Sequence, residues 1–163
     1  MLGESGDYCA RLVRELRSAT LAQVAKLPEV RRRSEQVRSM IEAGLNQFHK
    51  GARLEDDEIV VFDVESTDVI VSRYAPYYFF PQARYSLGIV RSEAGARITA
   101  MRNPWREFPS TPLGRIFEKF GGGGHERVGA LLLPGNGATK AKVILRQLFR
   151  EIRKQNPSPR LEG

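Results

Sequence analysis

The four consecutive glycines Gly121–Gly124 constrain this chain more than any other feature of its sequence. Glycine loses more backbone freedom on folding than any other residue, so a folded segment keeps four in a row only where bare backbone is needed. The run lies between two apolar, periodic segments, 113–120 and 128–133, whereas a flexible linker usually lies among polar residues. The backbone N–H groups of successive glycines, which have no Cβ atoms, can form a concave site for an anion. We therefore expect a phosphate here.

The residues that follow the glycines extend this prediction. His125 and Arg127 place two nitrogen-bearing side chains at the edge of the expected site. The candidate anion site therefore consists of Gly122, Gly123, Gly124, His125 and Arg127. The alternatives are a flexible glycine linker and a histidine that is solvated or structural.

A second candidate segment, Arg102–Arg106, follows an expected strand. The Arg102 guanidinium can donate two parallel hydrogen bonds to a phosphate. Asn103 can recognise a base edge or a sugar hydroxyl. Trp105, the only tryptophan, can stack on a nucleobase, but the interpretation we favour for it is a core residue.

The positive charge is concentrated around these segments. Residues 81–163 carry 15 Lys and Arg against 6 Asp and Glu, whereas residues 51–80 carry 2 against 7. A local basic field raises the concentration of an anionic ligand and speeds its capture. The charge is weaker support for duplex DNA, because the sequence has no helix-turn-helix or zinc-finger pattern.

The pattern of apolar residues predicts an α/β fold, with a small mixed, partly antiparallel sheet flanked by helices. Residues 5–48 indicate two helices, the second beginning at Pro28. Strands are expected at 58–63, 84–91, 96–102 and 128–133, the middle two forming a hairpin with its turn at 93–95. Further helices are expected just before Pro81, at 112–120 with Ser110 or Thr111 as N-cap, and at 138–154.

Domain organisation and location follow from the same features. We expect a helical connector at 1–50, a ligand-binding domain at 51–155 and a disordered tail at 156–163. A single cysteine, the absence of a membrane-spanning apolar run and the absence of a signal-peptide pattern predict a cytoplasmic protein.

The sequence offers little for a self-contained catalyst. The acidic cluster 55–58 is interpreted as a solvated turn, and its spacing does not match a calcium loop. His49 and His125 lack metal-ligand spacing, and no Gly-x-Ser-x-Gly pattern is present. We therefore assign no catalytic and no metal-binding residue, and expect an anion-binding module.

The motifs resemble those of the DHH-associated domain, type 1. This is the C-terminal lobe of DHH-family phosphoesterases, which include nanoRNases, phosphoadenosine phosphatases, cyclic-dinucleotide phosphodiesterases and RecJ-like exonucleases. The family shows Ser-Leu-Arg-Ser at a strand end, then a helix, then Gly-Gly-Gly-His-Pro-x-Ala-Ala-Gly. Here the similar segments are 100–103 and Gly122–Ala130, in which the family's proline and Ala-Ala-Gly are replaced.

The resemblance covers about residues 50–155 and implies a hydrolase related to exopolyphosphatases. It implies that this lobe binds a short oligonucleotide or a nucleotide phosphate. His125 would form a hydrogen bond with a phosphoryl oxygen, and Arg102 and Arg127 would neutralise the charge of the phosphate. Mn²⁺ or Mg²⁺ is expected in an N-terminal catalytic lobe that carries an Asp-His-His signature absent from this chain. The chain then looks like a detached C-terminal part that is not catalytic alone.

Two alternatives remain open. The domain also resembles the glycine-rich C-terminal domain of alanyl-tRNA synthetases, so an RNA-binding module is the second hypothesis. The third is structural: the apolar stripes of the N-terminal helices need a partner surface, and a homodimer would supply one.

Overall fold

The computed structural model describes residues 6–155, so the predicted tail at 156–163 lies outside the described residues. The chain divides into two compact units, residues 1–40 and residues 41–163. This division falls inside the long helix α3 (Pro28–Gly51), ten residues before the boundary expected from the sequence. The candidate site residues all belong to the second unit.

The first unit contains α1 (Gly6–Glu15), α2 (Leu21–Val24) and the first part of α3. The prediction of one helix before Pro28 is wrong, because α1 ends at Glu15 and a separate helix, α2, begins after its N-cap residue Thr20. Thr20 forms a capping box: its Oγ1 accepts from the Gln23 N–H at 3.3 Å, and Gln23 Oε1 accepts from the Thr20 N–H at 2.8 Å. These bonds satisfy N–H groups at a helix start, which favours a new helix there.

Charged contacts tie α1 to the start of α3. The Glu29 carboxylate forms ion pairs with Arg11 at 3.2 Å and Arg33 at 3.1 Å, and the Arg33 guanidinium lies 4.0 Å from the centre of the Tyr8 ring. Ion pairs that solvent still reaches, as here, stabilise a fold by only about 0.2–1 kcal/mol each.

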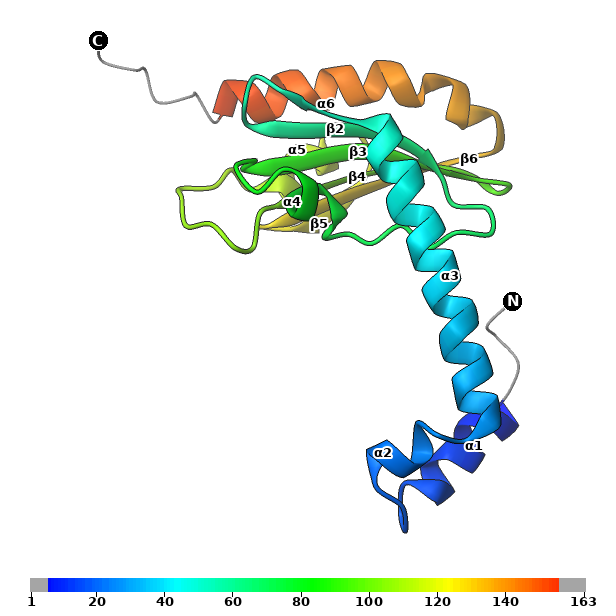
Figure 1. Ribbon diagram of the computed structural model, residues 1–163. Coiled ribbons are helices and arrows are strands. Elements are labelled where there is room, and N and C mark those ends of the chain that lie inside the picture. Colours follow the sequence, from blue (N-terminus) through cyan, green and yellow to red (C-terminus); the bar gives the residue numbers. More distant parts are fainter. Residues whose placement is uncertain (1–5, 156–163) are drawn as a thin grey trace. The chain divides into compact units, whose positions relative to one another are not determined.

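The second unit is built on a six-stranded sheet of order β1-β2-β3-β4-β6-β5 (Figure 1). Its strands are β1 (Ala52–Glu55), β2 (Ile59–Glu65), β3 (Tyr85–Ser92), β4 (Gly95–Arg102), β5 (Gly123–His125) and β6 (Val128–Pro134). Only β2 and β3 pair in parallel, and the other described pairs are antiparallel. The predicted α/β class with a mixed, partly antiparallel sheet is confirmed.

The predicted hairpin is confirmed as β3 and β4, which pair from Tyr85 with Arg102 to Ser92 with Gly95. Strands β1 and β5 were not predicted. They are only four and three residues long, and neither contains the β-branched or aromatic residues that mark a strand in sequence.

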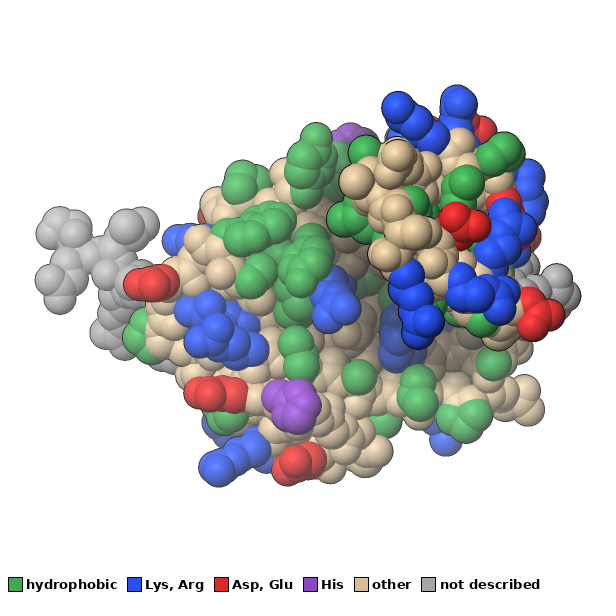
Figure 2. Space-filling model, turned by 90° about the horizontal axis from the view of Figure 1, so that it is seen from below, with side chains coloured by type: hydrophobic (Ala, Val, Ile, Leu, Met, Phe, Trp, Pro, Cys, Tyr) green, Lys and Arg blue, Asp and Glu red, His purple; other side chains and the backbone are tan. Residues whose placement is uncertain are grey.

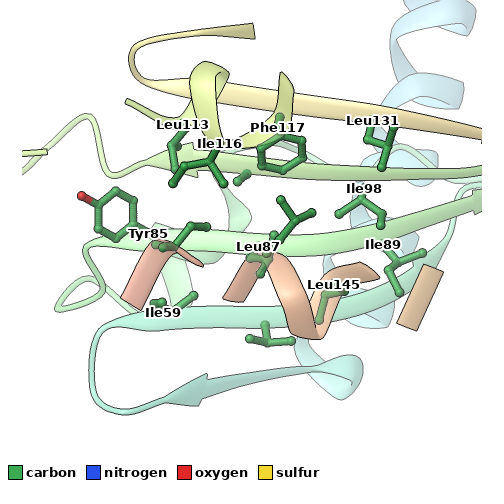
Figure 3. Close-up of a cluster of buried hydrophobic side chains, with 14 of the residues drawn as sticks. Ile59, Tyr85, Leu87, Ile89, Ile98, Leu113, Ile116, Phe117, Leu131 and Leu145 are labelled. Carbon is green, nitrogen blue, oxygen red and sulfur yellow. The ribbon is translucent and has the colours of Figure 1, made fainter. Parts of the chain in front are cut away.

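One face of the sheet packs against α5 (Leu113–Glu118) and α6 (Ala141–Gln155), which follows a short 3₁₀ helix, η1 (Gly135–Lys140). Figure 3 shows Leu113, Ile116 and Phe117 of α5 and Leu145 of α6 directed at the strand side chains. Burying each such side chain stabilises the fold by about 1.5–3 kcal/mol.

The opposite face packs against α4 (Ala75–Phe79) and the end of α3. Phe48 of α3 is fully buried there, with ring-centre distances of 5.1 Å to Phe62 and 5.9 Å to Phe79. Helix α4 ends before Pro81, as predicted. No helix within residues 6–155 is both long enough and apolar enough to cross a membrane.

Candidate anion-binding site

The start of α5 differs from its prediction. Neither Ser110 nor Thr111 caps the helix; Pro112 occupies the N-cap position, and no side chain caps the helix there. Instead, the Leu113 N–H donates to the Glu126 carbonyl at 3.0 Å. The turn after β5 therefore supplies the acceptor that a capping side chain would otherwise provide.

The first two glycines of the run end α5. Gly121 has a φ of +82°, its N–H donates to the Glu118 carbonyl at 3.0 Å, and the Gly122 N–H donates to the Phe117 carbonyl at 3.0 Å. This is the Schellman pattern of a helix C-terminus, as the sequence predicted for Gly121. The N–H of Gly122 is thereby engaged within the protein.

The remaining glycines form an edge strand rather than the expected concave loop. Gly123, Gly124 and His125 make up β5, which pairs with β6 at the end of the sheet. Gly124 has a φ of +153°, and a Cβ there would collide with the Val128 carbonyl oxygen. A Cβ on Gly122 would collide with the Ala130 carbonyl oxygen, so the fold itself requires these two glycines.

Gly123 has no such requirement. A Cβ at this position would meet no atom within 4 Å, and Gly123 is absent from the positive-φ glycines. Neither packing nor backbone geometry therefore requires a glycine at position 123, whereas close approach of a ligand would require one.

A hollow of about 520 Å³ lies between α5 and β5. It is lined by Pro112, Gly114, Arg115, Glu118, Gly124, His125 and Glu126. Of the predicted site residues, only Gly124 and His125 line it. Both are exposed, so a ligand has access to the imidazole.

Arg115 adds a cation that the sequence analysis missed, on the exposed face of α5. The sequence feature that could have identified Arg115 is its position in a helix that ends at the glycine run. Glu118 and Glu126 also line the hollow. The basic field expected from the sequence is therefore not found among the residues that line the hollow, and an anion bound there would need directed hydrogen bonds.

Arg102 and Asn103 do not line the hollow. The Arg102 guanidinium is buried and donates to the carbonyls of Asn103 at 3.1 Å and Phe108 at 3.0 Å. The fully buried Asn103 amide donates to the Ala83 carbonyl at 2.7 Å and the Pro81 carbonyl at 3.3 Å. Both side chains thus stabilise the conformation of the segment that follows β4 through hydrogen bonds to backbone carbonyls.

Arg127 is exposed in the turn between β5 and β6, outside the residues that line the hollow. Its carbonyl accepts a hydrogen bond from the Arg102 N–H at 2.9 Å. The structure thus brings the two predicted segments side by side through the backbone.

Two further observations bear on the chemistry. The core interpretation of Trp105 is wrong, since 62% of its surface is exposed. Within residues 6–155, no three His, Cys, Asp or Glu side chains come together as a group that could hold a metal ion.

Comparison with known proteins gives similarity in fold. No protein-family model matches the sequence, and no curated protein matches it. A pGpG-specific phosphodiesterase, PggH, from Vibrio cholerae is 19% identical with a TM-score of 0.69, over 88% of this chain and 50% of that protein. An exopolyphosphatase-related protein from Bacteroides fragilis is 12% identical with a TM-score of 0.53, over 94% of this chain and 45% of that protein. The chain therefore has the fold of about half of each of these proteins.

Proposed function

We propose that this chain is the substrate-binding lobe of a DHH-family phosphoesterase, which holds a nucleotide or short oligonucleotide by its phosphate. The fold shared with parts of a phosphodiesterase and of an exopolyphosphatase-related protein supports a phosphoesterase. The glycine-histidine motif of the DHH-associated domain, Gly122–His125, supports the family.

The observation that carries the proposal is the accessible imidazole of His125, which lines one hollow together with Arg115. The bare backbone of Gly123, which the fold does not require, lies two residues before His125 on the same strand. Among residues 6–155, β5 is an edge strand, with one side that no described strand pairs, and backbone N–H groups on such a side can donate to an anion. Phosphate oxygens accept charge-assisted hydrogen bonds from arginine, and His125 can donate a further one. Arg127 adds positive charge nearby.

The catalytic groups are proposed to lie in a separate lobe, together with the Mn²⁺ or Mg²⁺ that the resemblance implies. The residues described here do not form a metal site, and we derive no reaction step through a metal. The whole protein's activity, a cytoplasmic location and a homodimer through the N-terminal helices stay predictions.

A second candidate function, RNA binding, is favoured by one feature of α6. Lys142, Arg146 and Arg150 recur at four-residue spacing, are exposed, and line a second hollow of about 460 Å³. Cations at this spacing lie on one side of a helix and suit a phosphate backbone. A steep loss of affinity with salt and a footprint of many nucleotides would favour this candidate.

The proposal is tested by calorimetric titration of the chain with a 5′-phosphorylated dinucleotide. We expect His125→Ala to weaken binding about tenfold or more, since a hydrogen bond to a charged group contributes about 1.5–3 kcal/mol. His49→Ala is the matched control, because His49 is the other histidine and lies in α3 against Phe79, with ring centres 4.8 Å apart. Equal affinity of His125→Ala and the unmodified chain would overturn the assignment.

A further inference from the structure

Three large aromatic side chains of the second unit are exposed. The exposed fractions are 62% for Trp105, 73% for Tyr78 and 45% for Tyr74. Figure 2 shows hydrophobic side chains gathered on the face seen from below, with Lys and Arg side chains next to them. Clustered exposed aromatic residues mark surfaces that bind something. We call Tyr74, Tyr78 and Trp105 the aromatic platform.

Two rings of the platform, those of Tyr74 and Trp105, are held in place by each other and by Tyr77. Tyr74 and Trp105 stack with ring centres 6.0 Å apart and an angle of 26°, and Tyr77 meets Trp105 edge-on at 6.2 Å and 80°. Tyr77 is buried, and its hydroxyl lies 2.5 Å from the Met101 carbonyl oxygen and 3.0 Å from Ser86 Oγ. The exposed indole therefore rests on a fixed support.

The backbone of Trp105 is fixed as well. Its N–H donates to Asn103 Oδ1 at 2.9 Å, and the Asn103 amide is itself bonded to the Pro81 and Ala83 carbonyls. The described hydrogen bonds of the Asn103 side chain are thus all to backbone groups, which makes it a positioning residue for the backbone that carries the indole. A preorganised ring loses little entropy when a ligand stacks on it.

Cations flank the platform. The Arg73 guanidinium lies 5.7 Å from the centre of the Tyr74 ring, and Arg106 beside Trp105 donates to the Gln82 carbonyl. Both arginines are exposed. Aromatic rings combined with arginines are the usual means by which proteins bind unpaired bases and their phosphates.

The platform and the hollow lie at related places on the sheet. Trp105 follows the end of β4, and β5 is separated from β4 by β6 alone. Near the end of β4, Met101 pairs with Val128, and Val128 pairs with His125. Strands are spaced by about 4.8 Å, so the backbones of Met101 and His125 lie about 10 Å apart at the same end of the sheet. A ligand that spans this end of the sheet would place a phosphate near His125 and a base near Trp105.

We infer that the aromatic platform stacks a nucleobase of the ligand, so that the substrate is a nucleotide or oligonucleotide and not inorganic polyphosphate. The inference rests on the proposed function, because it adds a base contact to the phosphate site. Polyphosphate has no ring to stack, and the platform would contribute nothing to its binding. The competing possibility is that another protein binds to the platform.

Trp105 makes the test direct, because it is the only tryptophan and its fluorescence reports on its own ring. The chain is titrated with a 5′-phosphorylated dinucleotide and, separately, with sodium tripolyphosphate. We expect saturable quenching by the dinucleotide and none by tripolyphosphate. By calorimetry, Trp105→Ala should weaken dinucleotide binding about tenfold or more, and Trp105→Phe should restore most of it.

Leu132→Ala is the control, since Leu132 is also a large exposed apolar residue, at 72%, on β6. Dinucleotide affinity that is unchanged in Trp105→Ala, or absence of quenching, would overturn the inference and point to a protein occupant. Dependence on His125 in that case would leave the proposed phosphate site intact. Loss of the His125 dependence would instead overturn the proposed function.

Discussion

Gly114 of α5 lies directly against Gly124 of β5: a Cβ on Gly114 would stand 2.7 Å from the Gly124 carbonyl carbon. The absence of a side chain at Gly114 therefore lets the helix approach the backbone of Gly124 and His125 this closely. The hollow that holds His125 and Arg115 opens between the same two elements. The geometry of the candidate site thus depends on this contact.

Gly114→Ala should destabilise the protein, although alanine normally favours a helix over glycine by about 1 kcal/mol. The new methyl group would press on the backbone of Gly124 and His125, and overpacking of this kind opposes folding by about 1–3 kcal/mol. Urea unfolding gives the free energy directly. An increase in stability would show that α5 and β5 do not pack this closely.

Gly123→Ala and Gly124→Ala form a matched pair. Gly124→Ala should destabilise the fold by about 1–3 kcal/mol, because its φ of +153° and the Val128 carbonyl both oppose a side chain. Gly123→Ala should leave stability unchanged or raise it by about 0.4–1 kcal/mol, since its Cβ would meet open space.

The same Gly123→Ala variant should bind the dinucleotide more weakly, because the methyl group would occupy the space of the ligand. Unfolding and calorimetric titration of one preparation separate the two effects. A Gly123→Ala variant with unchanged affinity would mean that no ligand approaches this backbone.

Arg115→Ala should reduce dinucleotide affinity about fivefold or more, because one charge-assisted hydrogen bond to phosphate is lost. Stability should change by less than about 0.5 kcal/mol, since Arg115 is exposed. Arg146→Ala, an exposed arginine on α6 that lines the other hollow, serves as the control. A larger loss in Arg146→Ala than in Arg115→Ala would favour the RNA-binding candidate.

Stability should fall at alkaline pH because of Tyr77. Burial raises the pKa of its hydroxyl well above the ordinary value of 10.0. Above pH 10 the unfolded chain loses this proton while the folded chain keeps it, so the free energy of unfolding decreases as pH rises. Urea midpoints at pH 9 and pH 11 measure the decrease, and Tyr77→Phe should remove this part of it. An equal pH dependence in Tyr77→Phe would contradict the assignment.

The sequence predicted those elements in which local pattern and packing agree. The β3–β4 hairpin has alternating apolar residues and a short turn, and the end of α5 at Gly121 has a glycine where the chain needs a positive φ. Both features are local, so they can be recognised without knowing the fold.

Elements that depend on distant partners could not be predicted. β5 is a strand because β6 offers it an edge, and α5 is capped by the Glu126 carbonyl from the next turn. For the same reason the sequence could not show that Arg115 lies beside His125. It also could not show that buried Asn103 supports an exposed Trp105, which reverses the expected roles of a polar and an aromatic residue.

An NMR titration of the 163-residue chain with a 5′-phosphorylated dinucleotide tests the central claim most directly. The account predicts saturable shifts of the backbone amides of Gly123, Gly124, His125 and Arg115, which disappear in His125→Ala. Shifts confined to α6, or no shifts at all, would contradict a phosphate site at β5.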